Sequence, residues 1–327
     1  MINGRLSGIN EIDDGLAVLV ANNAKNLNLL GVTAIFGNNT VDYTYQAAAH
    51  LNELLPTYKK FQLIKGAALP LHETHAHHWW KTQPENHTPS NSCLNAATHF
   101  MAEKIKASSL KIMLLGLGPA TDIACLIEHY PQLHSKIAKI VLLMGRYPHQ
   151  VLNVANRQGL IDFNYAQDEN AALMILKQHA IPLVLIPFKV SSSIFIRSKD
   201  IARPKNTNNL SQFLYEITQA WMQQWQKQFG QQGFYPWDLH VINYAINNKA
   251  YDCEPMGYKI VPCNRLNNNC IGHEKMYSGS LLAQEKSQLL LSPQYANSNK
   301  ILVCTQLHKQ QQSIFVNRIL ALYSFYT

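Results

Sequence analysis

The sequence predicts an α/β fold in which helices flank a mainly parallel central sheet. Short apolar runs alternate along the chain with segments of helical periodicity. The apolar runs are nearly continuous, which is typical of strands buried on both faces. Strands that alternate with helices form a parallel sheet through right-handed crossovers. These observations together define the expected fold class.

The expected elements follow one another in a regular order. The strands are expected at residues 28–37, 61–67, 111–118, 139–145 and 181–188. Helices are expected at 13–21, 40–55, 119–130 and 168–180, where apolar residues recur at helical spacing. Ligands of such sheets bind beyond the carboxyl ends of the strands. The function is therefore expected at the loops that follow these five strands.

The chain is expected to form a single domain over residues 1–327. Its composition, 47% hydrophobic and 15% charged, provides for a substantial core, and no long linker or repeat divides it. A helical lid-type segment is expected at about 205–232. Apolar residues of that segment recur at helical spacing, and packing is preferred to ligand binding as their role.

The charge distribution and the cysteine pattern limit the kinds of partner and the cellular compartment to be expected. The net charge is +8, but basic residues are scattered, so no nucleic-acid surface is expected. No window reaches the ~18 apolar residues of a membrane span, and the opening residues lack a secretory pattern. Six cysteines without a C-x-x-C pair are expected to be reduced thiols. A cytoplasmic protein is the resulting expectation.

Polar side chains gather at the expected strand ends. Asp13 and Asp14 open a helix, where acids also complement the helix dipole. Asn38 and Thr121 follow strands, and Asp238 heads a later apolar helix. Either the acids are ordinary helix starts or they form one half of a metal site.

Five segments, in order, resemble the nucleoside hydrolase family, and the likeness covers nearly the whole chain. The family's opening Asp-x-Asp-Pro-Gly-x-Asp-Asp falls on residues 7–14. The other matching segments are GVTAIFGNN, GPATDIA, VLLMGR, and Asn156 followed by DFNYAQDENAA. The resemblance implies a Rossmann-like core and cleavage of the N-glycosidic bond of a ribonucleoside. It also implies a homo-oligomer, either a dimer or a tetramer.

The resemblance assigns roles to particular residues. It implies that Asp14, Asp238 and the main-chain carbonyl of Thr121 bind Ca²⁺, which favours oxygen ligands. Asp13 would hold a ribose hydroxyl. Asn156, Asp162 and Asn164 would hold the rest of the sugar, and Asn38 is a further expected substrate-binding residue. Oxygen ligands around the sugar would stabilise an oxocarbenium-like transition state.

One departure from the family pattern bears on catalysis. The aspartate that activates water falls on Ile9, and the leading segment INGRLSGI is more polar than the buried first strand that the family pattern predicts there. A local slip would let Glu11 supply the missing carboxylate, so Asp13, Glu11 and Asp238 are the expected catalytic residues. Alternatively, the protein keeps the fold as a nucleoside-binding or regulatory protein without turnover.

The base pocket is expected to be aromatic. Trp237 precedes Asp238, and Trp79 and Trp80 lie in an early loop, as in the purine-specific branch of the family. Two indole rings would sandwich a purine. Packing in the core is an equal alternative for Trp237, and His240 is an alternative acid. Hydrolysis of a pyrimidine or nicotinamide riboside remains a third interpretation.

Overall fold

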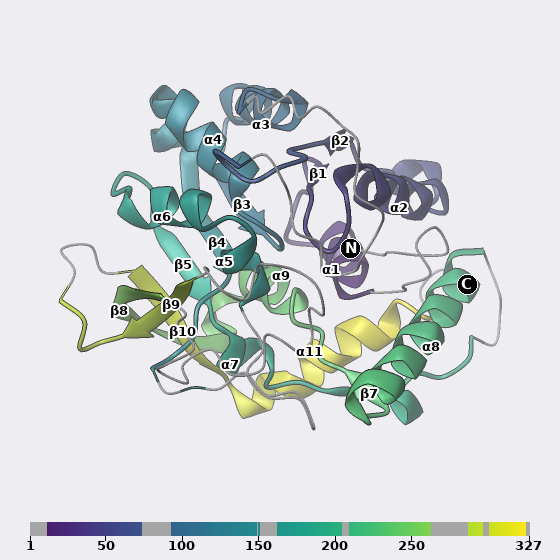
Figure 1. Ribbon diagram of the computed structural model, residues 1–327. Coiled ribbons are helices and arrows are strands. Elements are labelled where there is room, and N and C mark those ends of the chain that lie inside the picture. Colours follow the sequence, from purple (N-terminus) through teal and green to yellow (C-terminus); the bar gives the residue numbers. More distant parts are fainter. Residues whose placement is uncertain are drawn as a thin grey trace.

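The α/β prediction is confirmed by the computed structural model (Figure 1). The structure describes residues 12–73, 93–148, 150, 162–204, 209–262, 287–296 and 301–324. A six-stranded sheet has the order β3-β4-β5-β10-β8-β9, in which β3, β4, β5 and β10 are parallel. Its strands are β3 (Ile112–Gly116), β4 (Ile137–Leu143), β5 (Leu183–Ile186), β8 (Tyr251–Pro262), β9 (Ser287–Ser292) and β10 (Ile301–Leu307).

Two shorter pairs of strands accompany this sheet. β1 (Val32–Ala34) and β2 (Leu63–Lys65) are parallel, and β6 (Ile196–Arg197) and β7 (Gly233–Phe234) are antiparallel. All five predicted strands are therefore present, although most are shorter than their apolar runs. β1 is hydrogen-bonded only to β2 and β3 only to β4 in the described part of the chain, so both have an open edge.

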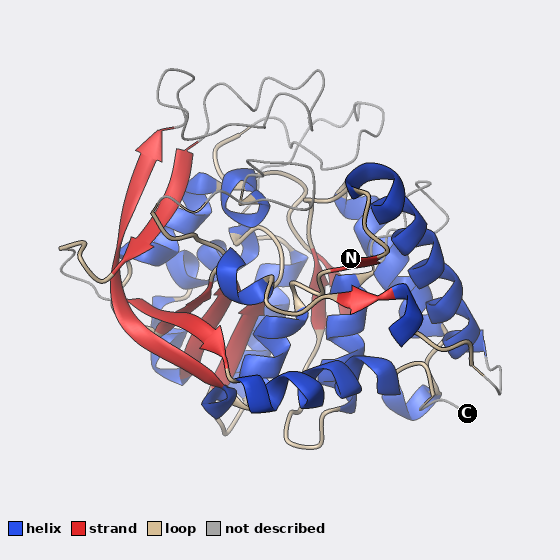
Figure 2. Ribbon diagram, turned by 90° about the horizontal axis from the view of Figure 1, so that it is seen from below, coloured by secondary structure: helices blue, strands red, loops and turns tan. Residues whose placement is uncertain are grey.

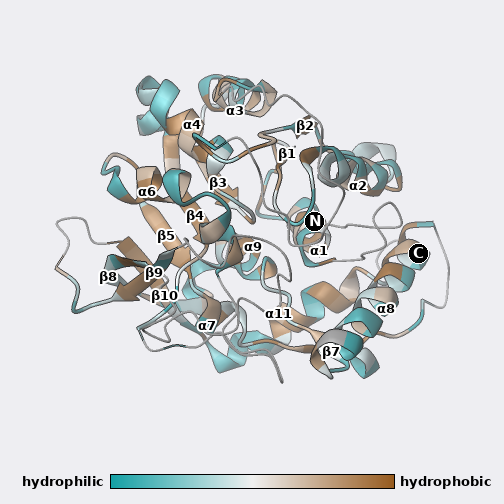
Figure 3. Ribbon diagram, viewed as in Figure 1, coloured by the Kyte–Doolittle hydropathy of each residue, from teal (hydrophilic) through white to brown (hydrophobic). Residues whose placement is uncertain are grey.

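The central strands are buried on both faces, as their continuous apolar runs predicted. In β4, Val141 belongs to one core cluster and Ile140 to the other, and both are fully buried. The residues of β5 also alternate between the two clusters, because successive strand residues point to opposite faces of the sheet. Figure 3 shows the resulting concentration of hydrophobic residues along these strands. Each such side chain contributes about 1.5–3 kcal/mol through burial.

Helices cover the two faces. One core includes α1 (Asp13–Asn23), α8 (Asn209–Phe229), α9 (Leu239–Ile246) and α11 (Lys309–Ala321). The other includes α3 (Ala96–Ala107), α4 (Thr121–His129) and α6 (Glu169–Lys177). The described residues also form the α-helices α2 (Val41–Glu53), α5 (Phe163–Gln167) and α7 (Phe188–Ser191).

The predicted lid-type segment contains α8, a helix of 21 residues. Leu214, Ile217 and Trp225 of this helix are buried in the core, as expected for a packing stripe. A lid function for the segment remains a prediction. None of the helices in the described ranges combines the length and the hydropathy that a membrane span requires.

The prediction of reduced cysteines is corrected by the structure. A disulfide bond joins Cys253 of β8 to Cys304 of β10, where the two residues are register partners. A second disulfide joins Cys93 to Cys125 of α4. Sequence spacing did not reveal these pairs because the strands and helices that bring the thiols together are distant along the chain. Figure 2 shows the antiparallel strands at one end of the molecule.

Candidate active site

Three carboxylates come together from two helix starts. Asp13 and Asp14 lie in the first turn of α1, and Asp238 is the N-cap residue of α9. One carboxylate oxygen from each lies within 4.8 Å of the others. The two helices pack against each other, so both positive helix ends support the same cluster. The structure thus joins the halves of the predicted acid site.

Asp13 has the chemistry expected of a cation ligand. Its side chain is 3% exposed, and its Oδ1 atom has no hydrogen-bond partner in the described residues. Burial raises the pKa of Asp13 to about 6. Hydrogen bonds from the backbone N–H groups of Trp237 and Asp238 favour the charged form and partly offset this rise. Three neighbouring carboxylates repel one another unless a cation neutralises them. The oxygen donors and the unsatisfied Oδ1 atom fit a hard divalent ion such as Ca²⁺.

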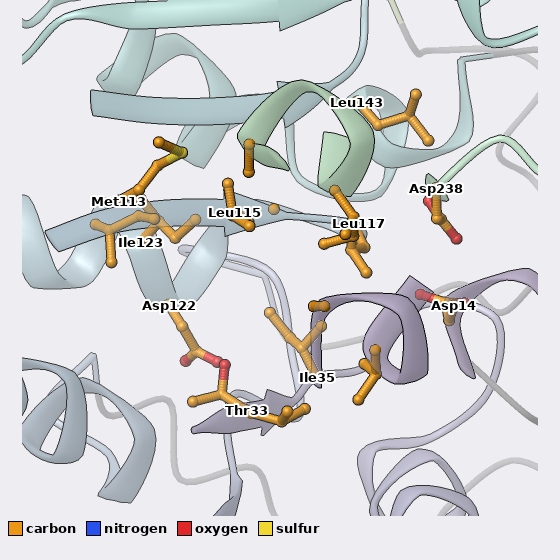
Figure 4. A pocket seen from close by; sticks show the side chains of 18 of the residues that line it. Asp14, Thr33, Ile35, Met113, Leu115, Leu117, Asp122, Ile123, Leu143 and Asp238 are labelled. Atoms are coloured by element: carbon orange, nitrogen blue, oxygen red, sulfur yellow. The ribbon is translucent and has the colours of Figure 1, made fainter. Parts of the chain in front are cut away.

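The acids lie at one end of a cavity of about 690 Å³ (Figure 4). Met113, Leu115, Leu117 and Ile35 line the apolar part, which runs between β1 and β3. Consecutive residues of β3 all line the cavity, so the cavity follows the open edge of the strand and not one face. Only the polar end therefore has the chemistry of a sugar site.

Asn164 and Asp162 reach this polar end from the loop and helix after β4. The Nδ2 group of Asn164 donates to the carbonyls of Leu117 (2.9 Å) and Leu143 (3.0 Å). Because both amide protons are used, Asn164 can offer only its oxygen to a ligand. The Asp162 carboxylate accepts hydrogen bonds from the Gly145 and Tyr165 N–H groups. Burial raises the pKa of Asp162, and these two donors together with Arg146 oppose the rise.

Two further predicted residues line the same cavity. Asn38 follows Gly37, whose φ of +146° allows the sharp turn after β1. Trp237 stacks on Tyr235, with ring centroids 6.0 Å apart, and its Nε1–H donates to Ser192. Trp237 packs in an aromatic cluster, as the core alternative expected, and it also borders the cavity.

His240 and Thr121 are not placed as expected. His240 is fully buried between Tyr251 and Phe315 and does not line the cavity, because the helical turn of α9 directs it into the core. Burial lowers the pKa of His240 to about 3, which favours the neutral ring.

Thr121 lies outside the cavity wall, and its hydroxyl donates to Asp168 (2.6 Å). It begins α4, where the main-chain carbonyl is directed along the helix toward the N–H four residues later. Leu117, before this helix, lines the cavity instead. Four other predicted residues, Glu11, Trp79, Trp80 and Asn156, lie outside the described residues.

Asp122 is a buried carboxylate that the sequence analysis did not assign. It lines the cavity and accepts hydrogen bonds from Ala67 N–H (3.1 Å) and Asn95 Nδ2 (2.7 Å). Burial raises its pKa to about 6. The signal was an acid inside the apolar segment GPATDIA, at a position where the family pattern has asparagine.

The protein thus has an α/β fold with a mainly parallel sheet. At the carboxyl ends of its strands lies a cluster of three carboxylates, of the kind that can hold a metal ion. Residues 8–312 match the model of the inosine-uridine preferring nucleoside hydrolase family, and the chain belongs to this family. The family members are known to depend on a metal ion.

Similar proteins agree with this assignment. The chain is 29% identical over 206 residues to a pyrimidine-specific ribonucleoside hydrolase RihA from Klebsiella pneumoniae, a match that covers 60% of this chain and 63% of that protein. It is 31% identical to RihA from Shewanella woodyi over 205 residues, with the same two shares. The match thus spans less than two thirds of these relatives.

A solved structure shows the same fold over nearly the full length. A purine-preferring ribonucleoside hydrolase from Gardnerella vaginalis superposes with a TM-score of 0.70. The alignment covers 98% of each chain at 16% identity. This likeness concerns the fold alone.

Proposed function

We propose that the protein hydrolyses the N-glycosidic bond of ribonucleosides, with purine nucleosides preferred, in a Ca²⁺-dependent reaction. The observation that carries this proposal is the convergence of Asp13, Asp14 and Asp238 at the polar end of one cavity. Asn38, Asp162 and Asn164 line the same cavity. This arrangement supports the proposal, because it would place a cation site beside groups able to contact a sugar.

Asp14 and Asp238 would hold Ca²⁺, and Asp13 beside them would hold a ribose hydroxyl. When bound, this ion offers coordination sites for a water molecule and for two adjacent ribose hydroxyls. The Asn164 oxygen would accept a hydrogen bond from the sugar, and the Asp162 carboxylate would accept another. In the reaction, a water oxygen bonds to C1′, and the bond between C1′ and the base nitrogen breaks. The electron pair of that bond leaves with the base, which takes up a proton.

Activation of the water needs a proton acceptor. Asp13 is the proposed acceptor, because its carboxylate is buried within the acid cluster at the polar end of the cavity. Glu11 is proposed to act with it, since Ile9 cannot accept a proton. This division of roles distinguishes the proposal from loss of catalysis in a nucleoside-binding protein.

The preference for purines is proposed from Trp237, which borders the cavity and presents an aromatic ring for stacking. Pyrimidine nucleosides are the second candidate, favoured by the names of the RihA relatives. Replacing Trp237 by leucine separates the two, because loss of purine cleavage with retained pyrimidine cleavage indicates stacking.

A homo-oligomer, either a dimer or a tetramer, is proposed from the family resemblance. A cytoplasmic location was expected from cysteines interpreted as reduced thiols and from opening residues without a secretory pattern. The two disulfides instead favour an oxidising compartment. The decisive measurement for the location is the thiol state of the protein isolated from its native cells under acid quenching.

The function is tested by release of reducing sugar from inosine, adenosine, guanosine, uridine and cytidine with excess Ca²⁺. Calorimetry with the same nucleosides is run in parallel. Turnover that is greatest with purines supports the full proposal, and turnover of pyrimidines alone supports the second candidate. Binding without turnover identifies a recognition protein, and the absence of both refutes a nucleoside site.

A further inference from the structure

A group of potential metal ligands lies along one face of α4, outside the cavity of the candidate active site. The helix carries Cys125, Glu128 and His129 at positions i, i+3 and i+4, which places all three on the same face. Cys93, which precedes α3, is bonded to Cys125. α3 and α4 lie side by side (Figure 1). Two sulfur atoms, an imidazole and a carboxylate are therefore gathered at one place.

The spacing of the ligand atoms is close to that of a tetrahedral zinc site. One ligand atom each from Cys93, Glu128 and His129 lies within 4.8 Å of the others. With metal–ligand bonds of about 2.0–2.3 Å, the corners of a zinc tetrahedron are about 3.4–3.8 Å apart. Glu128 and His129 are exposed, so their side chains can close this difference by small rotations. Cys125, next to Cys93, supplies the fourth corner once the bond between them is broken.

The exposed half of this cluster is available to a cation. Nε2 of His129 and Oε2 of Glu128 are 3.8 Å apart, beyond hydrogen-bond distance. Within the described ranges, neither side chain has a hydrogen-bond partner. The sulfur half is shielded, since Cys125 is fully buried and Cys93 is half-buried. An ion would thus enter from solvent and meet the two sulfur atoms at the edge of the core.

The second disulfide provides an internal comparison. Cys253 and Cys304 are joined across two antiparallel strands, and they belong to no cluster of three potential ligands among the described residues. A purely structural disulfide needs no histidine or carboxylate beside it. The ligands around Cys93 and Cys125 therefore distinguish that pair from the other one.

We propose that the reduced protein binds Zn²⁺ through the thiolates of Cys93 and Cys125, the imidazole of His129 and the carboxylate of Glu128. A dithiol reductant passes two electrons and two protons to the protein disulfide, which becomes two thiols, and is itself oxidised to a disulfide. On binding Zn²⁺, both thiols release their protons and four ligand bonds form. The disulfide and the ion are alternative links between the same two segments, for an oxidising and a reducing compartment respectively.

Either link holds the segment before α3 against α4. Asn95, two residues after Cys93, caps α3 by accepting a hydrogen bond from the Thr98 N–H group (3.0 Å). Its Nδ2 group donates to Asp122 at the cavity wall (2.7 Å). The ion would therefore stabilise the fold beside Asp122 without contacting a substrate, and its binding is independent of nucleoside hydrolysis.

Titration with Co²⁺ tests the site, because Co²⁺ occupies zinc sites and thiolate ligands give it an intense charge-transfer band in the near ultraviolet. The full chain is reduced with a dithiol, freed of metal with a chelator and transferred to anaerobic buffer with excess Ca²⁺, which occupies the acid cluster. A band that saturates at one Co²⁺ ion per chain and disappears on addition of Zn²⁺ is expected. Carboxylate ligands such as Asp13 do not produce this band.

Variants assign the band to particular ligands. Cys93→Ser and His129→Ala should each weaken Co²⁺ binding at least about tenfold, because each removes a ligand bond. Cys253→Ser is the matched thiol control, and His179→Ala is the matched control for an exposed histidine. Both controls should leave the band unchanged. Because His129 is exposed, its replacement should not prevent folding, and thermal unfolding of the reduced variants checks this.

The absence of a charge-transfer band, or a band that is unchanged in Cys93→Ser and His129→Ala, would overturn the site. Thermal unfolding gives a second, independent measurement. Zn²⁺ should raise the melting temperature of the reduced protein and leave that of the oxidised protein unchanged, because the disulfide already occupies both sulfur atoms. An equal rise in the two forms would contradict ligation by Cys93 and Cys125.

Discussion

The carboxylates of Asp13 and Asp238 approach within 4.8 Å, although they belong to helices at opposite parts of the sequence. Neither α1 nor α9 begins with a side chain that caps its own backbone by a hydrogen bond. The acids at these helix starts are therefore directed to each other and to the cavity, which makes them suited to a shared cation.

Removal of one acid is expected to disrupt the cation site. Asp14→Ala and Asp238→Ala should each abolish Ca²⁺ binding and ribose affinity, because each removes a charged oxygen ligand. Calorimetric titration with Ca²⁺ measures the effect. Asp42→Asn is the control, since Asp42 pairs with Lys65 at the surface and lies outside the cavity. Unchanged Ca²⁺ binding in both alanine variants would refute the metal assignment.

Asp122 is expected to make folding stability depend on pH. The folded state binds its proton up to a pH of about 6, whereas the unfolded chain releases it near the ordinary value of 3.8. Below that value both states are protonated and the stability is fully present. It is lost as the pH rises toward 6, by up to about 3 kcal/mol.

Asp122→Asn should remove this loss, because an amide remains neutral and still accepts hydrogen bonds from Ala67 and Asn95. Urea unfolding at pH 4.5 and pH 7.5 provides the test. The variant should be more stable than the original protein at pH 7.5, and the gain should shrink at pH 4.5. The same gain at both values would show that charge burial is not the cause.

Restoring a carboxylate at residue 9 should increase turnover. Ile9→Asp supplies the water-activating group of the family pattern, and general base catalysis is worth about 10²- to 10⁴-fold. The increase in kcat is measured with inosine and uridine at saturating Ca²⁺. Ile9→Asn is the matched control, because it has nearly the same shape without a base. An equal rate in both variants would argue against a base at this position.

The polar residues that precede Ile12 are expected to lower the stability of the fold, because β1 and β3 each have an open edge. The apolar slot between them suits a buried strand, and the family pattern predicts such a strand in the segment that precedes Ile12. Replacing Asn3, Arg5 and Ser7 by valine should raise the melting temperature by several degrees, since polar groups are costly in an apolar slot. The exposed Arg203→Val variant should show no such rise. A fall in melting temperature would contradict the strand prediction.

The two disulfides should stabilise the fold. Reduction of the Cys253–Cys304 and Cys93–Cys125 bonds is expected to cost about 2–4 kcal/mol each, because each closes a long loop of the unfolded chain. Chemical unfolding with and without reductant measures the loss. Thiol titration of the unfolded, unreduced protein should find these four cysteines unreactive. Full reactivity before reduction would instead restore the prediction of reduced thiols.

The order of strands and helices was predictable from the sequence because burial on both faces leaves continuous apolar runs. The acids at residues 13, 14 and 238 could be recognised as a set through the family pattern, since each opens an apolar helix. Asn38, Asp162, Asn164 and Trp237 were also predicted, and all four line the cavity. The family resemblance thus selected residues that the structure places around one cavity.

The tertiary structure decided where each side chain points and which residues distant in sequence come into contact. His240 is in a suitable place along the sequence, yet the turn of α9 buries it against Tyr251 and Phe315. The disulfide partners and the open edge of β3 were equally hidden. The sequence by itself determined which residues are polar, apolar or able to bind a cation. The packing of distant elements decided which of them meet, because side-chain direction and burial are properties of the assembled core.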